Sequence, residues 1–289
     1  MDNSQRAVLR VLCPDRPGLV ADVTGLLFKM GVNVLHADEH IDLEANTFFQ
    51  RLEFVLAAAA ASGEQRAAFV SAIGQACTGW QMHWSLRFAD ELRRVAILVS
   101  KQGHCCLDLL QRHRAGELRC EIPLVISNHD AMAEEVARRG YRFVHEPIAG
   151  GDKQSQEARI GQRLVEERID LVVLARYMQI LTPALVDAWP ERIINIHHSF
   201  LPAFAGAEPY RQAYRRGVKL IGATSHYVTA DLDEGPIIAQ AVDRVGHRDT
   251  VEDLVRKGRD LERVVLAHAV RCHLEDRVIA YGNKTVVFD

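Results

Sequence analysis

Side chains that could carry out chemistry are concentrated between residues 193 and 240. Asn195 and His197 follow an apolar run that is typical of a buried strand, and they are two positions apart. Because alternate residues of a strand share a face, both side chains should project from the same side. A second strand-like run carries His226, and Asp233 lies in the turn that follows it. An amide, two imidazoles and a carboxylate at strand ends indicate a ligand site, since open α/β sheets bind ligands there.

These residue types form a coherent set for acyl chemistry that needs no metal. An amide N–H and a protonated imidazole can stabilise an oxyanion that develops on a carbonyl. A carboxylate can orient or deprotonate water and tune the imidazole. We expect partial burial to raise the pKa of Asp233 and to strengthen it as a base. The structural alternative is that Asn195 and Asp233 are ordinary turn-forming residues.

Two rival chemistries fit the spacing less well. A metal site at His197, His198, His226 and Asp233 would lack both an HExxH motif and a cysteine at zinc spacing. Adjacent His197 and His198 on a strand would point in opposite directions, so we expect no metal and expect His198 to pack behind the strand. Ser199 lies close to His197, but no GxSxG elbow supports a nucleophilic serine.

The turn Ser100-Lys101-Gln102-Gly103-His104 follows a strongly apolar run and contains one glycine. Turns that bind phosphate usually carry several glycines, whose backbone N–H groups cradle the anion. This turn therefore argues against a nucleotide or phosphorylated-sugar site. His104 either faces the reactive cleft or is a loop histidine that is hydrogen-bonded to the backbone.

The order of apolar patterns predicts an α/β protein of two domains. Residues 1–87 read strand, helix, strand, strand, helix, strand, which is the βαββαβ order of a ferredoxin-like unit, with Ser62 as an expected N-cap. Residues 88–93 are charged and predict a linker. Residues 94–289 alternate strand and helix patterns, which predicts a Rossmann-like, mostly parallel sheet. A long amphipathic helix over residues 250–275 and a tail hairpin complete it.

Composition excludes several classes of protein. The net charge of −3 gives no indication of a nucleic-acid or anionic-membrane partner. No apolar run approaches the roughly 18 residues of a membrane helix, and the first residues lack the pattern of a signal peptide. The six cysteines include no CxxC pair, so we expect free thiols and a cytoplasmic location.

The first domain resembles an ACT domain. The resemblance is carried by the turn Asp15-Arg16-Pro17-Gly18, which enters an apolar helix, and by Gly31-Val32-Asn33-Val34, which enters the second strand. ACT domains commonly bind small amino acids at domain interfaces, so the resemblance implies a possible effector, glycine or methionine, and a homo-oligomer. The implied effector positions are Asp15, Gly18, Val32 and Asn33. The alternative is that this unit serves only structure or oligomerisation.

The second domain resembles the 10-formyltetrahydrofolate-dependent formyltransferases. Residues 195–202, Asn-Ile-His-His-Ser-Phe-Leu-Pro, are similar to the family signature Asn-Ile-His-x-Ser-x-Leu-Pro. Residues 174–183, 222–228 and 232–238 resemble three further signatures in the same order. Together with the ACT-like domain, the pattern resembles the formyltetrahydrofolate deformylase family over essentially the whole chain. The resemblance implies hydrolysis of 10-formyltetrahydrofolate to formate and tetrahydrofolate without a cofactor, which supplies formate for purine synthesis and balances the one-carbon pool.

The same resemblance implies roles for individual residues and a cis peptide between Leu201 and Pro202. The implied catalytic residues are Asn195, His197 and Asp233, supported by Thr224 and His226. The implied folate pocket, formed partly by backbone groups, consists of Met178, Gln179, Ile180, Leu181, Val228 and Ala230.

Two departures from related chains bear on the acceptor. Transferases that act on glycinamide ribonucleotide carry a Gly-rich phosphate loop where this chain has residues 101–104, and its absence favours water. Glu208 stands where related chains often carry a basic or neutral residue, so we assign it no electrostatic role. Two alternatives remain, a formyltransferase with another acceptor and a non-enzymatic folate sensor governed by the ACT-like domain.

Overall fold

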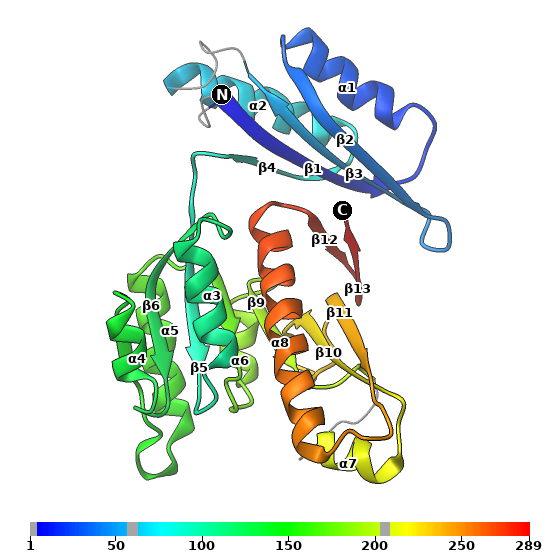
Figure 1. Cartoon of the computed structure of the whole chain (residues 1–289). Helices are drawn as coiled ribbons and strands as arrows, with labels where there is room; N and C mark the ends of the chain where they lie inside the picture. Colours follow the sequence, from blue (N-terminus) through cyan, green and yellow to red (C-terminus); the bar gives the residue numbers. More distant parts are fainter. Residues whose placement is uncertain (1–4, 57–62, 203–208) are drawn as a thin grey trace. The chain divides into compact units, whose positions relative to one another are not determined.

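The computed structural model divides the chain into two compact units (Figure 1), and it describes residues 5–56, 63–202 and 209–289. The first unit comprises Met1–Leu92 with Asp276–Ile279 and Val286–Asp289, and the second comprises Arg93–Glu275 with Ala280–Thr285. The C-terminal tail therefore contributes to both units, whereas the expected boundaries placed all of residues 94–289 in one domain. A hairpin pattern predicts two paired strands, but it does not indicate which core they join.

The first unit is a four-stranded antiparallel sheet with two helices, in the order β2-β3-β1-β4. Its elements follow the predicted βαββαβ order, and Ser62, the expected N-cap, lies outside the described residues. The elements are β1 (Arg6–Pro14), α1 (Leu19–Lys29), β2 (Asn33–Asp42), β3 (Thr47–Val55), α2 (Gly63–Gly79) and β4 (His83–Phe88).

Strict alternation along β1 explains why this sheet packs on one face. Ala7, Leu9 and Val11 are buried, while the residues between them are partly exposed. Since successive strand residues point to opposite faces, one face meets a common apolar core that includes Leu27 of α1 and Ile73 of α2.

The second unit is built on a seven-stranded sheet in the order β11-β10-β9-β8-β5-β6-β7. Neighbours from β9 through β7 pair in parallel, whereas β10 is antiparallel to both β9 and β11, which confirms the predicted mostly parallel sheet. Its elements are β5 (Arg93–Val99), α3 (His104–Arg114), β6 (Cys120–Ser127), α4 (Ala133–Arg138), β7 (Phe143–His145), η3 (Ala149–Gly151), α5 (Lys153–Glu166), β8 (Leu171–Leu174), α6 (Pro183–Asp187), β9 (Ile193–His197), α7 (Pro209–Arg216), β10 (Leu220–Tyr227), β11 (Ile237–Arg244) and α8 (Val251–Leu274). The tail forms the predicted hairpin, β12 (Val278–Tyr281) and β13 (Lys284–Val287).

The strand order reverses at β5, because β6 follows it on one side and β8 lies on the other. A crevice forms at the carboxyl ends of strands at such a point. Ser100, directly after β5, joins the neighbouring strand ends. Its Oγ donates to Asn128 Oδ1 at 2.7 Å and accepts from the backbone N–H of Met178 at 3.0 Å.

Helix α8 begins and ends almost where the sequence pattern predicts. Thr250 is its N-cap and forms a capping box with Asp253, which satisfies backbone N–H groups of the first turn. The buried face carries apolar residues such as Leu254 and Leu266, and it also carries the carboxylate of Glu262. Helices α3 and α8 lie side by side (Figure 1), so Glu262 can contact His104, the first residue of α3. Within the described parts of the chain, no helix is long and apolar enough to cross a membrane.

Candidate active site

Strands β9 and β10 bring three of the predicted residues to one cavity of about 370 Å³. Asn195 and His197 both line it, as their alternation on β9 predicts. Antiparallel pairing places His226 of β10 opposite Asn195, and Asn195 Nδ2 lies 3.3 Å from His226 Nε2. His226 Nδ1 lies 2.8 Å from the carbonyl oxygen of Tyr227 and donates to it. His226 Nε2 therefore remains directed at the cavity, beside the Asn195 amide.

Asp233 completes the group from the turn between β10 and β11. Its Oδ2 lies 3.1 Å from His197 Nδ1, and its Oδ1 lies 3.6 Å from His226 Nε2. Its φ of +57° lies in the left-handed region, which aspartate and asparagine adopt more readily than other non-glycine residues. The turn therefore points one carboxylate at two imidazoles.

The expected pKa of Asp233 was wrong in direction. The hydrogen bonds to His197 and His226 outweigh the effect of burial and hold the pKa of this carboxyl well below its usual range. The sequence pattern indicated burial beside an apolar strand, but it did not reveal two hydrogen-bonding rings. Asp233 is therefore ionised at neutral pH and a weak base. It is suited to holding the proton on His197 Nδ1 and to stabilising a positive charge on that ring.

His197 Nε2 is the polar atom left available by this arrangement. It is buried and has no hydrogen-bond partner among the described residues. Because Nδ1 is engaged by Asp233, Nε2 carries whatever proton exchange the ring makes with a ligand in the cavity. Buried polar groups are almost always paired in folded proteins, so an unpaired one at a cavity indicates where a ligand atom binds.

The strand pattern predicted that His198 packs behind the strand, and this prediction was wrong. Its ring stacks on that of His197, with centroids 5.1 Å apart and planes at 18°. Strand β9 ends at His197, so the alternation of side chains does not extend to the next residue. His198 lines the same cavity, and Arg176 NH1 donates to its Nδ1.

The residues predicted to form a ligand pocket all line this cavity. They follow the ends of β8 and β10 and comprise Met178, Gln179, Ile180, Leu181, Val228 and Ala230. Met178 and Ile180 are 57% and 61% exposed, so they leave apolar surface for a ligand to cover. Sequence reasoning missed several lining residues, namely Leu174, Arg176, Tyr177, Ile196, His198, Thr229 and Leu232. Most of them adjoin predicted positions, so extending each motif by one or two residues would have found them.

Thr224 supports the turn after β9 and, within the described residues, does not line the cavity. Its Oγ1 donates to the carbonyl oxygen of Ser199 at 2.9 Å and accepts from the backbone N–H of Leu201 at 3.0 Å. The peptide between Leu201 and Pro202 is cis, which confirms that prediction. Ser199 is buried and is likewise absent from the described cavity lining. Glu208 lies outside the described residues.

Comparisons with known proteins identify the family. A family model described as "Formyl transferase" matches residues 93–270, and one described as "ACT domain" matches residues 7–60. The formyltetrahydrofolate deformylase of Synechocystis sp. is 52% identical over 282 residues, which cover 98% of each chain. The chain belongs to the formyltetrahydrofolate deformylase family. The formyltetrahydrofolate deformylase of Bacillus subtilis is 50% identical over 99% of this chain and 95% of that protein.

A solved member of the deformylase family has the same fold. The crystal structure of a formyltetrahydrofolate deformylase from Pseudomonas syringae pv. tomato superposes with a TM-score of 0.94 at 44% identity, and it covers 99% of this chain and 95% of its own. The likeness includes both domains, so the ACT domain and the formyltransferase-fold domain belong together in this family.

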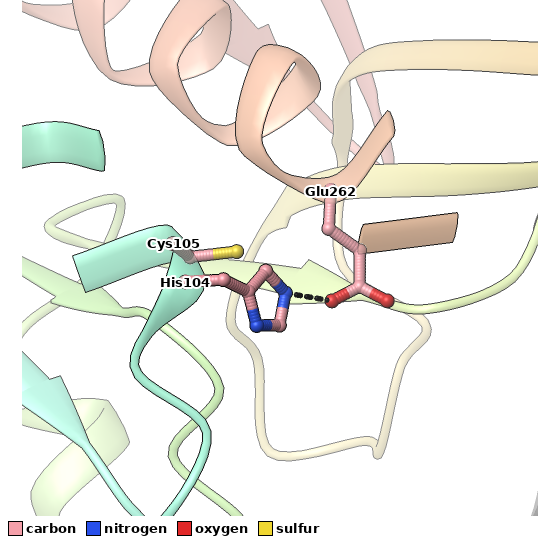
Figure 2. Close-up of side chains that lie close together, drawn as sticks. All are labelled: His104, Cys105 and Glu262. Carbon is pink, nitrogen blue, oxygen red and sulfur yellow. Dashed lines mark hydrogen bonds and ion pairs between the residues drawn. The ribbon is translucent and has the colours of Figure 1, made fainter. Parts of the chain in front are cut away.

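His104 in this deformylase-family chain pairs with a side chain rather than with the backbone. Its Nε2 lies 2.7 Å from Glu262 Oε2, and Figure 2 shows the two side chains pointing toward each other from α3 and α8. With Cys105 they place three potential metal-ligand atoms within 4.8 Å of one another. Glu262 Oε1 already accepts from Tyr210, however, and the Arg176 guanidinium lies 3.5 Å from Oε2. A neighbouring cation disfavours a metal ion, so we interpret these residues as a hydrogen-bonded network.

The four positions that the ACT resemblance implied for an effector do not meet within one chain. Gly18, with φ of +89°, precedes α1, whereas Val32 and Asn33 follow it. The 11 residues of α1 separate the two ends by roughly 16 Å at 1.5 Å per residue. One small amino acid cannot contact both pairs of positions. If these residues share a ligand, a second copy of the chain must supply part of the site.

Proposed function

We propose that this chain hydrolyses 10-formyltetrahydrofolate to formate and tetrahydrofolate. The observation that supports this most is His197 Nε2, which is buried and unpartnered among the described residues and lies at a cavity that Asn195 also lines. The ionised Asp233 lies on the other side of the ring, 3.1 Å from Nδ1. Asn195 and the ion-paired imidazole of His197 can each donate a hydrogen bond to the oxygen of a formyl group that water attacks. Family membership supports the same substrate.

The proposed reaction begins with attack of water on the formyl carbon. The oxyanion that forms accepts from Asn195 Nδ2 and from Nε2 of protonated His197. Asp233 orients the water and stabilises the imidazolium through Nδ1, because its low pKa makes it a poor acceptor of a full proton. His197 then passes its Nε2 proton to N10 of the folate as the C–N bond breaks. The neutral His197 then takes a proton from the added water, which restores the imidazolium and leaves formate.

The pocket favours a flat, largely apolar ligand with a polar edge. Met178 and Ile180 present exposed apolar side chains at the cavity. The segment after β8 is non-helical before α6 begins. Ser100 already accepts from the Met178 N–H, and Lys153 donates to the Ile180 carbonyl, so the other backbone groups of this segment would pair with a pterin. We assign the folate to the segments 178–181 and 228–230.

We also propose a place for this reaction in the cell. Its formate would supply purine synthesis, and its tetrahydrofolate would balance the one-carbon folate pool. The reaction as proposed consumes only water and the folate, with no cofactor. None of the six cysteines forms a disulfide, which suits a reducing cytoplasm. The ACT domain supports a homo-oligomer, since its implied effector positions lie at opposite ends of α1.

The decisive experiment is incubation of purified protein with 10-formyltetrahydrofolate in buffer that contains no amine. We expect one formate and one tetrahydrofolate for each substrate consumed. A formyltransferase with another acceptor would release no formate until that acceptor was added. A folate sensor would bind the compound and leave its formyl group in place. Either result would contradict the proposed hydrolysis.

Asn195→Ala is expected to lower kcat by about 100-fold, the scale of losing one oxyanion donor. The shape of the pH profile should not change, because a neutral amide does not titrate. Binding of a non-hydrolysable folate should persist, since the pocket lies mainly on other segments. Steady-state rates across pH, with calorimetric binding, check this. A parallel loss of binding and rate would mean that Asn195 holds the ligand or the fold.

A working effector site in the ACT domain should couple to both stability and rate. Glycine or methionine at millimolar concentration should raise the melting temperature, because a ligand that binds only the folded state stabilises it. The same ligand should change the deformylase rate if the two sites are coupled. Asn33→Ala, at the exposed beginning of β2, should weaken both responses. If neither amino acid alters either measurement, the domain serves structure alone.

A further inference from the structure

A buried guanidinium lies behind the two stacked histidines. Arg176 comes shortly after β8, is 8% exposed, and has a φ of +64° in the left-handed region. Its NH1 donates to His198 Nδ1, and its NH2 donates to Gln102 Oε1 at 3.1 Å. Its Nε lies 3.5 Å from Glu262 Oε2, an ion pair in which Nε makes no hydrogen bond. Each guanidinium nitrogen therefore faces a protein group, although the residue lines the cavity.

Glu262 anchors this guanidinium from helix α8. Its side chain is 1% exposed, and both oxygens accept hydrogen bonds, Oε1 from Tyr210 and Oε2 from His104, each at 2.7 Å. Burial alone would raise the pKa of this carboxyl. The hydrogen bond from His104, the charge of Arg176 and the hydrogen bond from Tyr210 together outweigh burial and hold the pKa below its ordinary value. Glu262 is thus a fixed negative charge, and truncating it would leave Arg176 unpaired in the interior.

Arg176 determines which form of His198 is present. A guanidinium only donates, so Nδ1 of His198 must accept and the ring proton must lie on Nε2. The charged groups around His198 are Arg176, His197, Glu262 and Asp233. Burial, followed by the charges of Arg176 and His197, lowers the pKa of His198 to about 4, against smaller opposing effects of the two carboxylates. His198 is neutral at physiological pH.

We propose that Arg176, anchored by Glu262, is a positioning residue that holds His198 as the neutral Nε2–H tautomer stacked on His197. A neutral partner matters because the proposed mechanism places a positive charge on His197. A second imidazolium at a centroid distance of 5.1 Å would oppose that charge. The consequence for turnover rests on the proposed function, whereas the state of His198 does not.

Nitrogen-15 NMR of the histidine-labelled full chain tests the state of His198 without substrate, and His198→Gln assigns its signals. We expect a protonated Nε2, an unprotonated Nδ1 and no titration from about pH 8 to about pH 5.5, where an unperturbed histidine would titrate. In Arg176→Met both tautomers should appear and a titration should enter this range. A wild-type His198 that carries its proton on Nδ1, or that titrates in this range, overturns the proposal even if no variant folds.

Kinetics separate positioning from mere stability. Arg176→Met should lower kcat by about 10-fold with KM for the folate unchanged, since misorientation of a catalytic group acts on the chemical step. Arg192→Met is the control, because Arg192 is a partly buried arginine of the same domain that instead stacks on Trp189 and donates to the backbone carbonyls of Ile169 and Asp170. The control should change neither kcat nor the His198 spectrum. A slow Arg176→Met enzyme with an unaltered His198 spectrum would also overturn the proposal.

Discussion

His197→Ala is expected to lower kcat by roughly 1,000-fold and to remove one limb of the pH profile. The ring supplies both an oxyanion donor and the proton for the departing folate nitrogen in the proposed mechanism, so two contributions are lost together. Its Nε2 is a buried polar atom that no described residue satisfies, and the ring lines the cavity. The measurement is kcat and kcat/KM against pH, alongside equilibrium binding of a non-hydrolysable folate, which should be retained.

His145→Ala provides a matched control for this experiment. His145 ends β7, at the edge of the same sheet opposite to β11, and its side chain is exposed. Its rate and pH profile should equal those of the wild type. If His197→Ala lost folate binding in proportion to its rate, His197 would be a binding residue and the proposed chemistry would be wrong. An unchanged pH profile in a slow enzyme would assign the proton transfer to another group.

Asp233→Asn is expected to lower kcat by a similar factor, roughly 1,000-fold, because the imidazolium of His197 loses its counter-charge and its fixed tautomer. Asparagine is the appropriate replacement, since it tolerates the φ of +57° at this position. The folded structure should therefore survive, as circular dichroism would show. Asp231→Asn, an exposed change two residues earlier in the same turn, should retain the wild-type rate. Wild-type activity in Asp233→Asn would refute the role.

The low pKa of Asp233 also predicts how stability depends on pH. A carboxyl whose pKa is lowered by folding contributes stability above its unfolded pKa, about 3.9, and loses it as pH falls toward the folded pKa. The unfolding free energy of Asp233→Asn should therefore lie below that of the wild type at neutral pH, and the difference should shrink below about pH 4. Urea denaturation at several pH values measures this. A difference that grew on acidification would contradict the ion pairing with His197 and His226.

Much of the architecture and of the candidate site could be predicted from local patterns. Alternation along β1 and the apolar run of β5 predicted strands in the places where they occur. Alternation on β9 predicted that Asn195 and His197 share a cavity. These predictions succeeded because period and burial are properties of short segments, in which backbone geometry relates neighbours directly.

The tertiary structure alone decided the electrostatics of the site. Asp233 was expected to have a raised pKa, yet two imidazoles from β9 and β10 lower it. Glu262 lies on the buried face of α8, where the local pattern predicts no partner for it, yet it pairs with His104, 158 positions earlier in the chain. Ionisation depends on charges and hydrogen bonds within a few ångströms, and their effect falls steeply with distance. Such contacts arise from packing between distant segments, which no local period encodes.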